Sequence, residues 1–306
     1  MVADEERLRG ALRVASALGE AHLGADYFTR LVLPLLERWA RLAARSAEEG
    51  SEALGAPLWI SLSGLPGTGK STFARLVTAL SGPLFGLKSA SISLDDVYLT
   101  QAERAELART VHPLLASRGV PGTHDLELLE RTLTRLESAA PEDETPVPRF
   151  DKLADERVPV QDWPIVRGRP DLILCDGWFF GTEPGPLQSL VTPVNAREAA
   201  EDPDGHFRAY VHDALARYQK LFARSDEHVH IEAPSFEASV AFRIEQGRRE
   251  LERRGRDPSE LEPERVRYFL DLFERVSSWQ RRKRPEWIVE LDAEHRIVAV
   301  RPPRSG

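Results

Sequence analysis

Two kinds of hydrophobic pattern alternate along most of this chain. Short apolar runs are typical of buried strands, and longer segments with apolar residues every three or four positions are typical of amphipathic helices. The runs predict strands at 58–63, 89–94, 171–175 and 228–232, with 287–291 and 297–300 as a closing hairpin. The longer segments predict helices at 70–80, 101–108, 126–138, 209–223, 236–254 and 263–282. This alternation favours an α/β fold with a mostly parallel sheet flanked by helices.

The first part of the chain has only the helical pattern. Apolar residues recur at helical spacing from 4 to about 46, with a break near 19–24, so two or three helices are expected there. The stretch 48–56 contains Gly and Ser and precedes Pro57, which predicts a loop. We therefore expect an N-terminal helical extension, residues 1–54, and one larger domain, residues 55–306.

The segment 141–170 has neither pattern and is rich in Pro, Asp and Arg. It predicts a long ordered loop over one end of the sheet. Long loops in compact domains are often functional.

Charge and cysteine content narrow the class of protein. A net charge of -8 without a strongly basic domain argues against nucleic acid as the main partner. The single Cys175 excludes an intramolecular disulfide, and its apolar neighbours predict a buried thiol in a reducing compartment. With no apolar leader and no stretch long enough to cross a bilayer, we expect a cytoplasmic protein without a membrane partner.

A glycine-rich loop lies between the first strand after the extension and the helix at 70–80, and it matches the phosphate-binding P-loop pattern. Its backbone N–H groups and the positive end of the helix dipole favour a bound phosphate. Lys70 is expected to reach the β- and γ-phosphates and Ser71 to bind Mg²⁺, so ATP and Mg²⁺ are the predicted cofactors. The predicted cofactor-binding residues are Gly64, Pro66, Gly67, Thr68, Gly69, Lys70, Ser71 and Thr72.

Carboxylates follow two further strands, where open α/β sheets bind their ligands. Asp95 and Asp96 follow the strand at 89–94, and we favour Asp95 as the base that accepts the proton of an acceptor hydroxyl. The alternative is that one of the two only caps a helix. Asp176 ends an apolar run, as a Walker-B carboxylate that binds Mg²⁺ does, although such runs also end in Asp for structural reasons. The predicted metal ligands are Ser71, Asp95 and Asp176.

Several arginines lie on the predicted helix 236–254 or just beyond it. We select Arg249 and Arg254 as lid residues that neutralise charge on the transferred group, and we count Arg249 among the catalytic residues. The alternative is that both are solvated. The basic run 281–284 is interpreted as a charged helix end.

Three histidines are candidate ligands. His228 and His230 share one face of a strand but lack a third ligand nearby, so a zinc site is not favoured. His124 follows a Gly- and Pro-containing loop in which polar groups are suited to recognise a hydroxy acid. Its neighbour Asp125 is expected to cap the helix at 126–138 in addition to any binding role.

Taken together, these segments resemble the D-glycerate 3-kinase family of the plant, fungal and bacterial type, which is akin to uridine kinase, phosphoribulokinase and pantothenate kinase. The resemblance covers roughly residues 57–185 and rests on 64–71, 93–100, 118–126, 148–152, 162–164 and 176–181. It implies transfer of the ATP γ-phosphate to the 3-hydroxyl of D-glycerate, which gives 3-phosphoglycerate and ADP. Lys70, Asp95 and Asp176 fall at catalytic positions. The positions expected to bind the acceptor are Asp96, Tyr98, Arg118, His124, Asp125, Arg149 and Lys152.

Two other functions remain open at this point. One is a P-loop kinase for a different small acceptor, such as a nucleoside, a sugar phosphate or pantothenate. The other is a nucleotide-dependent switch or ATPase module that uses the N-terminal helices as a contact surface. The sequence makes no prediction about the oligomeric state.

Overall fold

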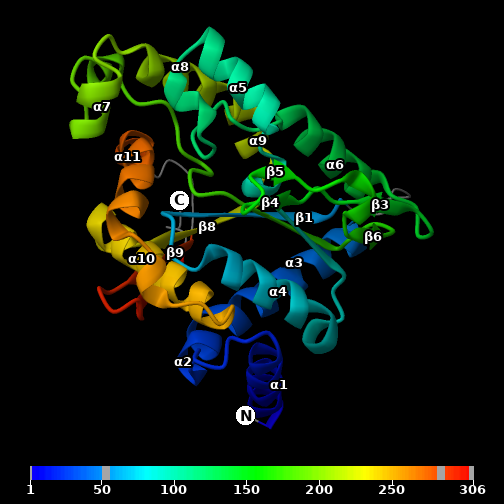
Figure 1. The fold of residues 1–306 in the computed structure, drawn as a ribbon. Helices are drawn as coiled ribbons and strands as arrows, with labels where there is room; N and C mark the ends of the chain where they lie inside the picture. The colour runs from blue at the N-terminus through cyan, green and yellow to red at the C-terminus, as the bar shows by residue number, and fades with distance from the viewer. Residues whose placement is uncertain (1, 50–55, 281–286, 303–306) are drawn as a thin grey trace.

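A six-stranded sheet forms the centre of the molecule (Figure 1). The structure, a computed structural model, describes residues 2–49, 56–280 and 287–302. The strands are β1 (Leu58–Gly64), β2 (Ser89–Ser93), β7 (Leu172–Asp176), β8 (Glu227–Glu232), β9 (Trp287–Leu291) and β10 (Ile297–Arg301), in the spatial order β10-β9-β8-β1-β7-β2. All neighbours pair in parallel except β9 and β10, which form an antiparallel hairpin. The predicted α/β fold and its closing hairpin are confirmed.

Helices cover both faces of this sheet (Figure 1). They are α1 (Val2–Ala17), α2 (Ala25–Tyr27), the π-helix η1 (Phe28–Val32), α3 (Leu33–Glu49), α4 (Lys70–Phe85), α5 (Gln101–Thr110), α6 (Leu126–Ser138), α7 (Ala196–Glu201), α8 (His206–Arg217), α9 (Gln219–Phe222), α10 (Phe236–Arg253) and α11 (Pro263–Trp279). Short 3-10 turns are η2 (Leu94–Val97), η3 (Pro113–Ala116), η4 (Val160–Asp162), η5 (Leu187–Leu190) and η6 (Pro258–Glu260).

Two predicted helices differ in detail from the observed ones. The helix predicted at 209–223 is divided into α8 and α9, because the N–H group of Tyr218 bonds to the carbonyl of Leu215, three residues back, and tightens the turn. The helix predicted at 263–282 ends as α11 at Trp279. The basic run 281–284 lies outside the described residues.

The segment 141–170 is ordered by two short antiparallel pairs. β3 (Glu144–Pro146) pairs with β6 (Ile165–Arg167), and β4 (Phe150–Asp151) pairs with β5 (Glu156–Arg157). The second pair folds the predicted binding residues at 149–152 into a hairpin. This hairpin lies near η2, which follows β2.

The sheet separates two hydrophobic cores. Along β7, Leu172 and Leu174 join one core and Ile173 and Cys175 join the other, because successive side chains of a strand point to opposite faces. The first core also contains Trp39 of α3, which is fully buried and whose indole N–H donates to Glu227 at 2.9 Å. The N-terminal helices therefore complete one face of the sheet. The division expected at residue 54 lies outside the described residues and stays a prediction.

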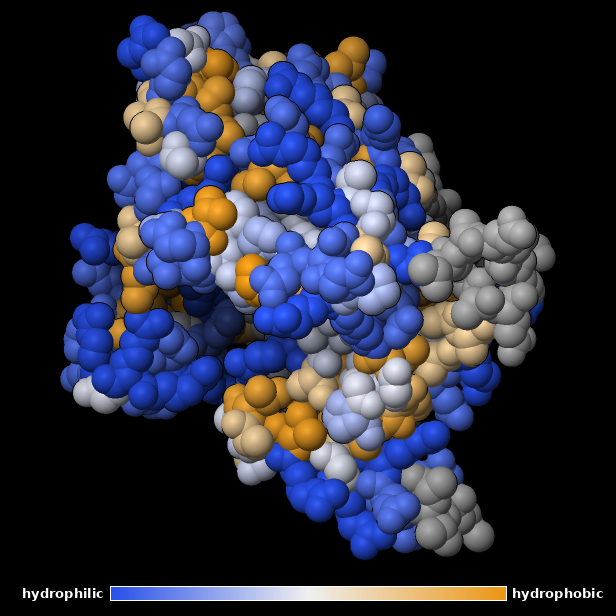
Figure 2. Space-filling model, turned by 90° about the vertical axis from the view of Figure 1, so that its right-hand side faces the viewer, coloured by the Kyte–Doolittle hydropathy of each residue, from blue (hydrophilic) through white to orange (hydrophobic). Residues whose placement is uncertain are grey.

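One face of the surface carries both hydrophilic and hydrophobic residues (Figure 2). Figure 2 shows one face, and on the part drawn in colour hydrophobic areas are broken up by hydrophilic ones. None of the helices in the described part of the chain is long and apolar enough to cross a bilayer.

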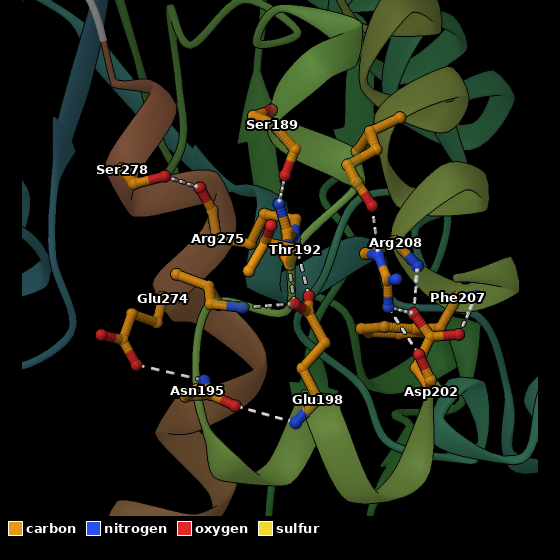
Figure 3. Close-up of polar contacts among 12 residues, drawn as sticks. Ser189, Thr192, Asn195, Glu198, Asp202, Phe207, Arg208, Glu274, Arg275 and Ser278 are labelled. Atoms are coloured by element: carbon orange, nitrogen blue, oxygen red, sulfur yellow. Dashed lines mark hydrogen bonds and ion pairs between the residues drawn. The ribbon is translucent and has the colours of Figure 1, made fainter. Parts of the chain in front are cut away.

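A buried polar network connects α7 and α8 to α11 (Figure 3). Arg275 of α11 pairs with Glu198 of α7, and both side chains are only 6% exposed. Arg208 of α8 pairs with Asp202 at 3.0 Å and also donates to the carbonyl oxygen of Leu190 at 2.6 Å. The network holds the first turn of α8 next to α7 and α11.

Removing one partner of the buried pair leaves an uncompensated charge in the interior. Replacing Glu198 by Ala should lower the free energy of unfolding by about 3 kcal/mol. The exposed pair of Arg131 and Glu127 offers a control, because Arg131→Ala should change stability by no more than about 0.5 kcal/mol. Urea titrations followed by tryptophan fluorescence measure both values, and equal midpoints would contradict a stabilising role for the network.

Candidate active site

The phosphate cradle is formed where β1 ends and α4 begins. Gly64 has φ 145°, and a Cβ atom there would lie 2.3 Å from the carbonyl oxygen of Ile231. Gly67 has φ 87°, and a Cβ atom there would lie 2.7 Å from the backbone nitrogen of Arg243. Gly69 has φ 90° and is the N-cap of α4. The loop therefore needs glycine at these positions, and it opens onto the N-terminus of a 16-residue helix.

The other residues of the cradle hold its shape or face its opening. Thr68 donates its hydroxyl to the carbonyl oxygen of Leu65 at 2.8 Å, and the carbonyl oxygen of Pro66 accepts from Ser239 at 2.6 Å. Ser71 is exposed and Thr72 is partly exposed, at the first turn of α4. Both hydroxyls are therefore open to a ligand placed over the cradle.

Lys70 lies inside the cradle with its ammonium group buried. Its Nζ atom donates to the carbonyl oxygen of Leu65 at 3.0 Å. Burial lowers the pKa of Lys70 to about 8, although the nearby Asp176 and Asp95 oppose the shift. The side chain is thus held over the loop by one carbonyl, a weak partner that a phosphate oxygen would replace.

Asp176 ends β7, in register with Leu62 of β1 and Ser93 of β2. It is buried, and burial together with the charge of Asp95 raises the pKa of Asp176 to about 6, while Lys70 opposes the rise. A buried carboxylate beside a phosphate cradle is a fitting ligand for a hard cation such as Mg²⁺. Asp176 and the hydroxyl of Ser71 are the oxygen ligands that could hold Mg²⁺ here.

Asp95 lies at the start of η2 and is bonded on both oxygens. Tyr98 donates its hydroxyl to Oδ1 at 2.6 Å, and Lys152 donates from Nζ to Oδ2 at 2.6 Å. Burial opposes ionisation, but the charge and the hydrogen bond of Lys152 and the hydroxyl of Tyr98 lower the pKa of Asp95 well below its usual range. The carboxyl group is therefore ionised in the free protein.

Helix capping does not explain the two aspartates. Ser93 caps η2 by accepting from the N–H group of Asp95, and Thr100 caps α5 with a capping box. Asp96 instead pairs with Arg149 at 3.0 Å and accepts from the N–H group of Phe150 at 3.4 Å. The alternative in which one of them serves only as a cap is therefore wrong.

The hairpin of β4 and β5 is held over the site by ion pairs. Besides Asp95 with Lys152 and Asp96 with Arg149, Arg118 pairs with Asp155 in the turn of the hairpin. These pairs bring together predicted residues from three segments that are distant in the sequence. They gather the three cations around Asp95, Asp96 and Asp155.

His124 and Asp125 follow the loop that Arg118 begins. His124 forms an isolated backbone bridge with Tyr98, and the two rings lie 4.6 Å apart. Burial lowers the pKa of His124 to about 4, so its ring is neutral at pH 7. Asp125 accepts from the N–H group of Leu128 at 2.9 Å, which confirms its expected role as the cap of α6.

The arginines of α10 differ in their distance from the site. Arg249 and Arg254 pair with Glu245 and Glu250 on the helix itself and are about half exposed, so their role as lid residues stays a prediction. Sequence reasoning passed over Arg243, whose pKa is lowered by burial and raised by the charge of Asp95. A signal was present, because Arg243 follows buried Val240 by three positions and therefore lies on the inward face of the helix.

His228 and His230 bind strand serines. The ring nitrogens of His228 lie 2.6 Å from the hydroxyl of Ser61 and 2.8 Å from that of Ser63, and His230 also contacts Ser63 at 2.8 Å. These contacts connect neighbouring strands β8 and β1.

Comparison with known proteins decides the family. No protein-family model matches the chain. The uncharacterized kinase mug58 of Schizosaccharomyces pombe is 32% identical over 201 residues, which cover 63% of this chain and 70% of that protein. The chloroplastic D-glycerate 3-kinase of Arabidopsis thaliana is 42% identical over 141 residues, which cover 42% of this chain and 30% of that protein.

The chain belongs to the D-glycerate 3-kinase family. It is therefore an ATP-dependent P-loop kinase, a phosphotransferase that uses an alcohol group as acceptor. The probable ATP-dependent kinase TDA10 of Saccharomyces cerevisiae is 34% identical over 139 residues, 42% of this chain and 47% of that protein. The fold agrees, since a D-glycerate 3-kinase from Cryptococcus neoformans superposes with a TM-score of 0.73 at 22% identity, over 89% of this chain and 99% of that one.

The buried charge of Asp176 should lower the free energy of unfolding of this chain. The pKa of Asp176 is raised from 3.8 to about 6, so above pH 6 the folded chain keeps an ionised carboxylate that burial disfavours. Asp176→Asn should therefore raise the free energy of unfolding at pH 7 by about 2 kcal/mol, a gain that shrinks as the pH falls from 6 to 4. The same variant should lose most kinase turnover. Urea titrations at pH 4 and pH 7 measure the gain, and a variant no more stable than wild type at pH 7 would contradict it.

Proposed function

We propose that this chain is a D-glycerate 3-kinase, which transfers the γ-phosphate of Mg·ATP to the 3-hydroxyl of D-glycerate and releases 3-phosphoglycerate and ADP. The observation that supports it best is the group of three cations, Arg118, Arg149 and Lys152, beside a phosphate cradle and an ionised carboxylate. These cations are suited to bind an anionic acceptor in addition to their aspartate partners, because Arg and Lys are the usual partners of a carboxylate. Relatives named D-glycerate 3-kinase support the same substrate.

In this proposal the cradle holds the phosphates and Lys70 exchanges its carbonyl partner for a phosphate oxygen. Mg²⁺, when bound by Ser71 and Asp176 with Asp95 nearby, would neutralise charge on the β- and γ-phosphates. Asp95 accepts the proton of the 3-hydroxyl and orients its oxygen toward the γ-phosphate. Its hydrogen bond with Tyr98 fixes the direction of the carboxylate.

The cations act on the acceptor. Arg118, Arg149 and Lys152 are already paired with Asp155, Asp96 and Asp95, so the acceptor carboxylate joins charges that are preorganised rather than mobile. Asp125 pairs with Arg157 at 3.3 Å at the edge of this group.

We assign Arg249 and Arg254 to a lid over the transferred phosphate. Backbone N–H groups of Ala154 and Leu153 lower the pKa of Asp151 in the β4–β5 hairpin, and the charge of Arg254 adds to this effect. Arg243 is the arginine of this helix whose charge already interacts with Asp95. We assign it the same electrostatic role from the inner face.

The cytoplasm is the compartment that we propose, because the single Cys175 is a buried thiol. The alternative of a nucleotide-dependent switch is less well supported. The apolar sides of the N-terminal helices are buried against α4 and the sheet rather than exposed for a partner.

The choice of acceptor can be tested by ADP release from Mg·ATP. D-glycerate should stimulate release and yield 3-phosphoglycerate, because its carboxylate can bind the cations while its 3-hydroxyl contacts Asp95. L-glycerate, uridine, ribulose 5-phosphate, pantothenate and a sample without acceptor serve as comparisons. Stimulation by another compound would replace the substrate, and release that is independent of acceptor would favour the switch.

The role of Asp95 can be tested by Asp95→Asn, which keeps the shape and removes the base. Turnover with D-glycerate should fall about 100-fold or more. ATP affinity, measured by calorimetry, should stay within about threefold, because the cradle is built by other residues. Asp162→Asn, an exposed carboxylate in η4, is the control. Unchanged turnover in Asp95→Asn would exclude Asp95 as the base.

A further inference from the structure

One nitrogen of His124 has no hydrogen-bond partner among the residues that the structure describes. The residue is 6% exposed, and its buried Nε2 atom is the unpaired one. Its other ring nitrogen, Nδ1, lies 2.8 Å from the hydroxyl of Tyr218. Buried polar atoms in native proteins are nearly always paired, so an unpaired nitrogen within a binding site indicates a ligand.

The partners of Tyr218 determine which nitrogen of His124 carries hydrogen. The N–H group of Gly122 donates to the hydroxyl oxygen of Tyr218 at 3.0 Å. The hydroxyl of Tyr218 is buried, and the acceptor that it contacts among the described residues is Nδ1 of His124. The O–H group of Tyr218 therefore donates to Nδ1, and the neutral ring of His124 carries its hydrogen on Nε2.

The unpaired atom is thus a neutral N–H donor with aromatic rings around it. The ring of His124 lies 4.6 Å from that of Tyr98, 5.6 Å from Phe179 and 5.8 Å from Tyr218. Tyr98, which contacts the ring of His124, also donates its hydroxyl to Asp95 at 2.6 Å, so the donor lies near the proposed base. Nε2 itself makes no hydrogen bond to Asp95 or to any other described residue.

D-glycerate offers three polar groups to such a site. The 3-hydroxyl is taken by Asp95 in the proposed reaction, and the carboxylate requires cations, which a neutral imidazole does not supply. The 2-hydroxyl remains. A buried donor aimed at a hydroxyl discriminates strongly against a compound that lacks it, because the donor is then left unpaired.

We propose that Tyr218 fixes His124 as an Nε2–H donor that binds the non-reacting hydroxyl of an α-hydroxy acid acceptor. The identity of the acceptor rests on the proposed function, whereas the hydrogen on Nε2 does not. Tyr218 touches no reacting atom in this proposal and is a positioning residue. It lies 94 positions from His124 in the sequence, which is why no local pattern indicated it.

Tyr218 is itself held in place by the helix layer. It follows α8, whose first turn is anchored by Arg208 and Asp202 in the buried network of Figure 3. Its ring packs 5.1 Å from Phe179 and 5.8 Å from Phe222. The hydroxyl of Tyr218 therefore has a fixed position beside the loop that contains Gly122 and His124.

Nitrogen NMR of the free protein tests the tautomer without any substrate. In ¹⁵N-histidine-labelled wild type, Nε2 of His124 should show the signal of a nitrogen that carries hydrogen and Nδ1 that of one that does not. Tyr218→Phe should give a mixture of the two tautomers. Tyr210→Phe is the matched control, because Tyr210 donates to the carbonyl oxygen of Gly122 at 3.3 Å rather than to His124. Hydrogen on Nδ1 in wild type, or no change in Tyr218→Phe, would overturn the proposal.

Kinetics with paired acceptors test what the donor binds. D-glycerate and 3-hydroxypropionate differ only in the 2-hydroxyl, so wild type should prefer D-glycerate. Tyr218→Phe should lower kcat/KM for D-glycerate about tenfold and leave the value for 3-hydroxypropionate and the KM for ATP unchanged. An equal loss with both acceptors would indicate a structural effect only and would overturn the proposal.

His124 variants guard against a folding defect. His124→Gln keeps an N–H donor and should retain part of the preference for D-glycerate, whereas His124→Leu should lose it, with thermal melts showing that both fold. If both variants keep the full preference, the donor role is wrong. Failure of wild type to phosphorylate D-glycerate at all would instead remove the proposed substrate, and the NMR result would still decide the tautomer.

Discussion

The site depends on the parallel pairing of β1 with a neighbour on each side. β7 and β8 border β1, and both faces of β1 are buried, so the point where this strand ends is fixed by the whole sheet. Gly64 at that point leaves no room for a side chain beside β8. Asp176 ends the neighbouring strand in the same register. The cradle and its carboxylate thus hold their geometry before any nucleotide binds.

The acceptor side is built differently, from loops that ion pairs hold together. Trp178, just after β7, donates to the carbonyl oxygen of Gly119 at 2.8 Å, and Phe273 of α11 leaves no space for a side chain on Gly119. The loop that contains Arg118 and His124 therefore packs against the apolar side chains of Trp178 and Phe273, and the ion pair of Arg118 with Asp155 restrains it further. The sheet fixes the site that binds the phosphates, and ion pairs fix the loops that are expected to bind the acceptor. This arrangement is suited to hold the two substrates in line for transfer.

The sequence predicted the strands, the cradle and the order of the carboxylates, because these depend on local periodicity and on glycines that a tight loop requires. It could not predict what distant contacts decide. The packing of Trp39 on the sheet and the contact of Tyr218 with His124 each arise from residues far apart in the chain. The cap formed by Asp125, by contrast, could be expected from its neighbours.

The core that α3 shares with the sheet constrains how the two parts of the chain can change in evolution. Trp39 and its neighbours fill a surface that the β-sheet would otherwise expose, much as a separate subunit fills an interface. The contact depends on complementary shape and not on the peptide link that joins the two parts. A change in the size of a side chain on either part would therefore require a compensating change on the other.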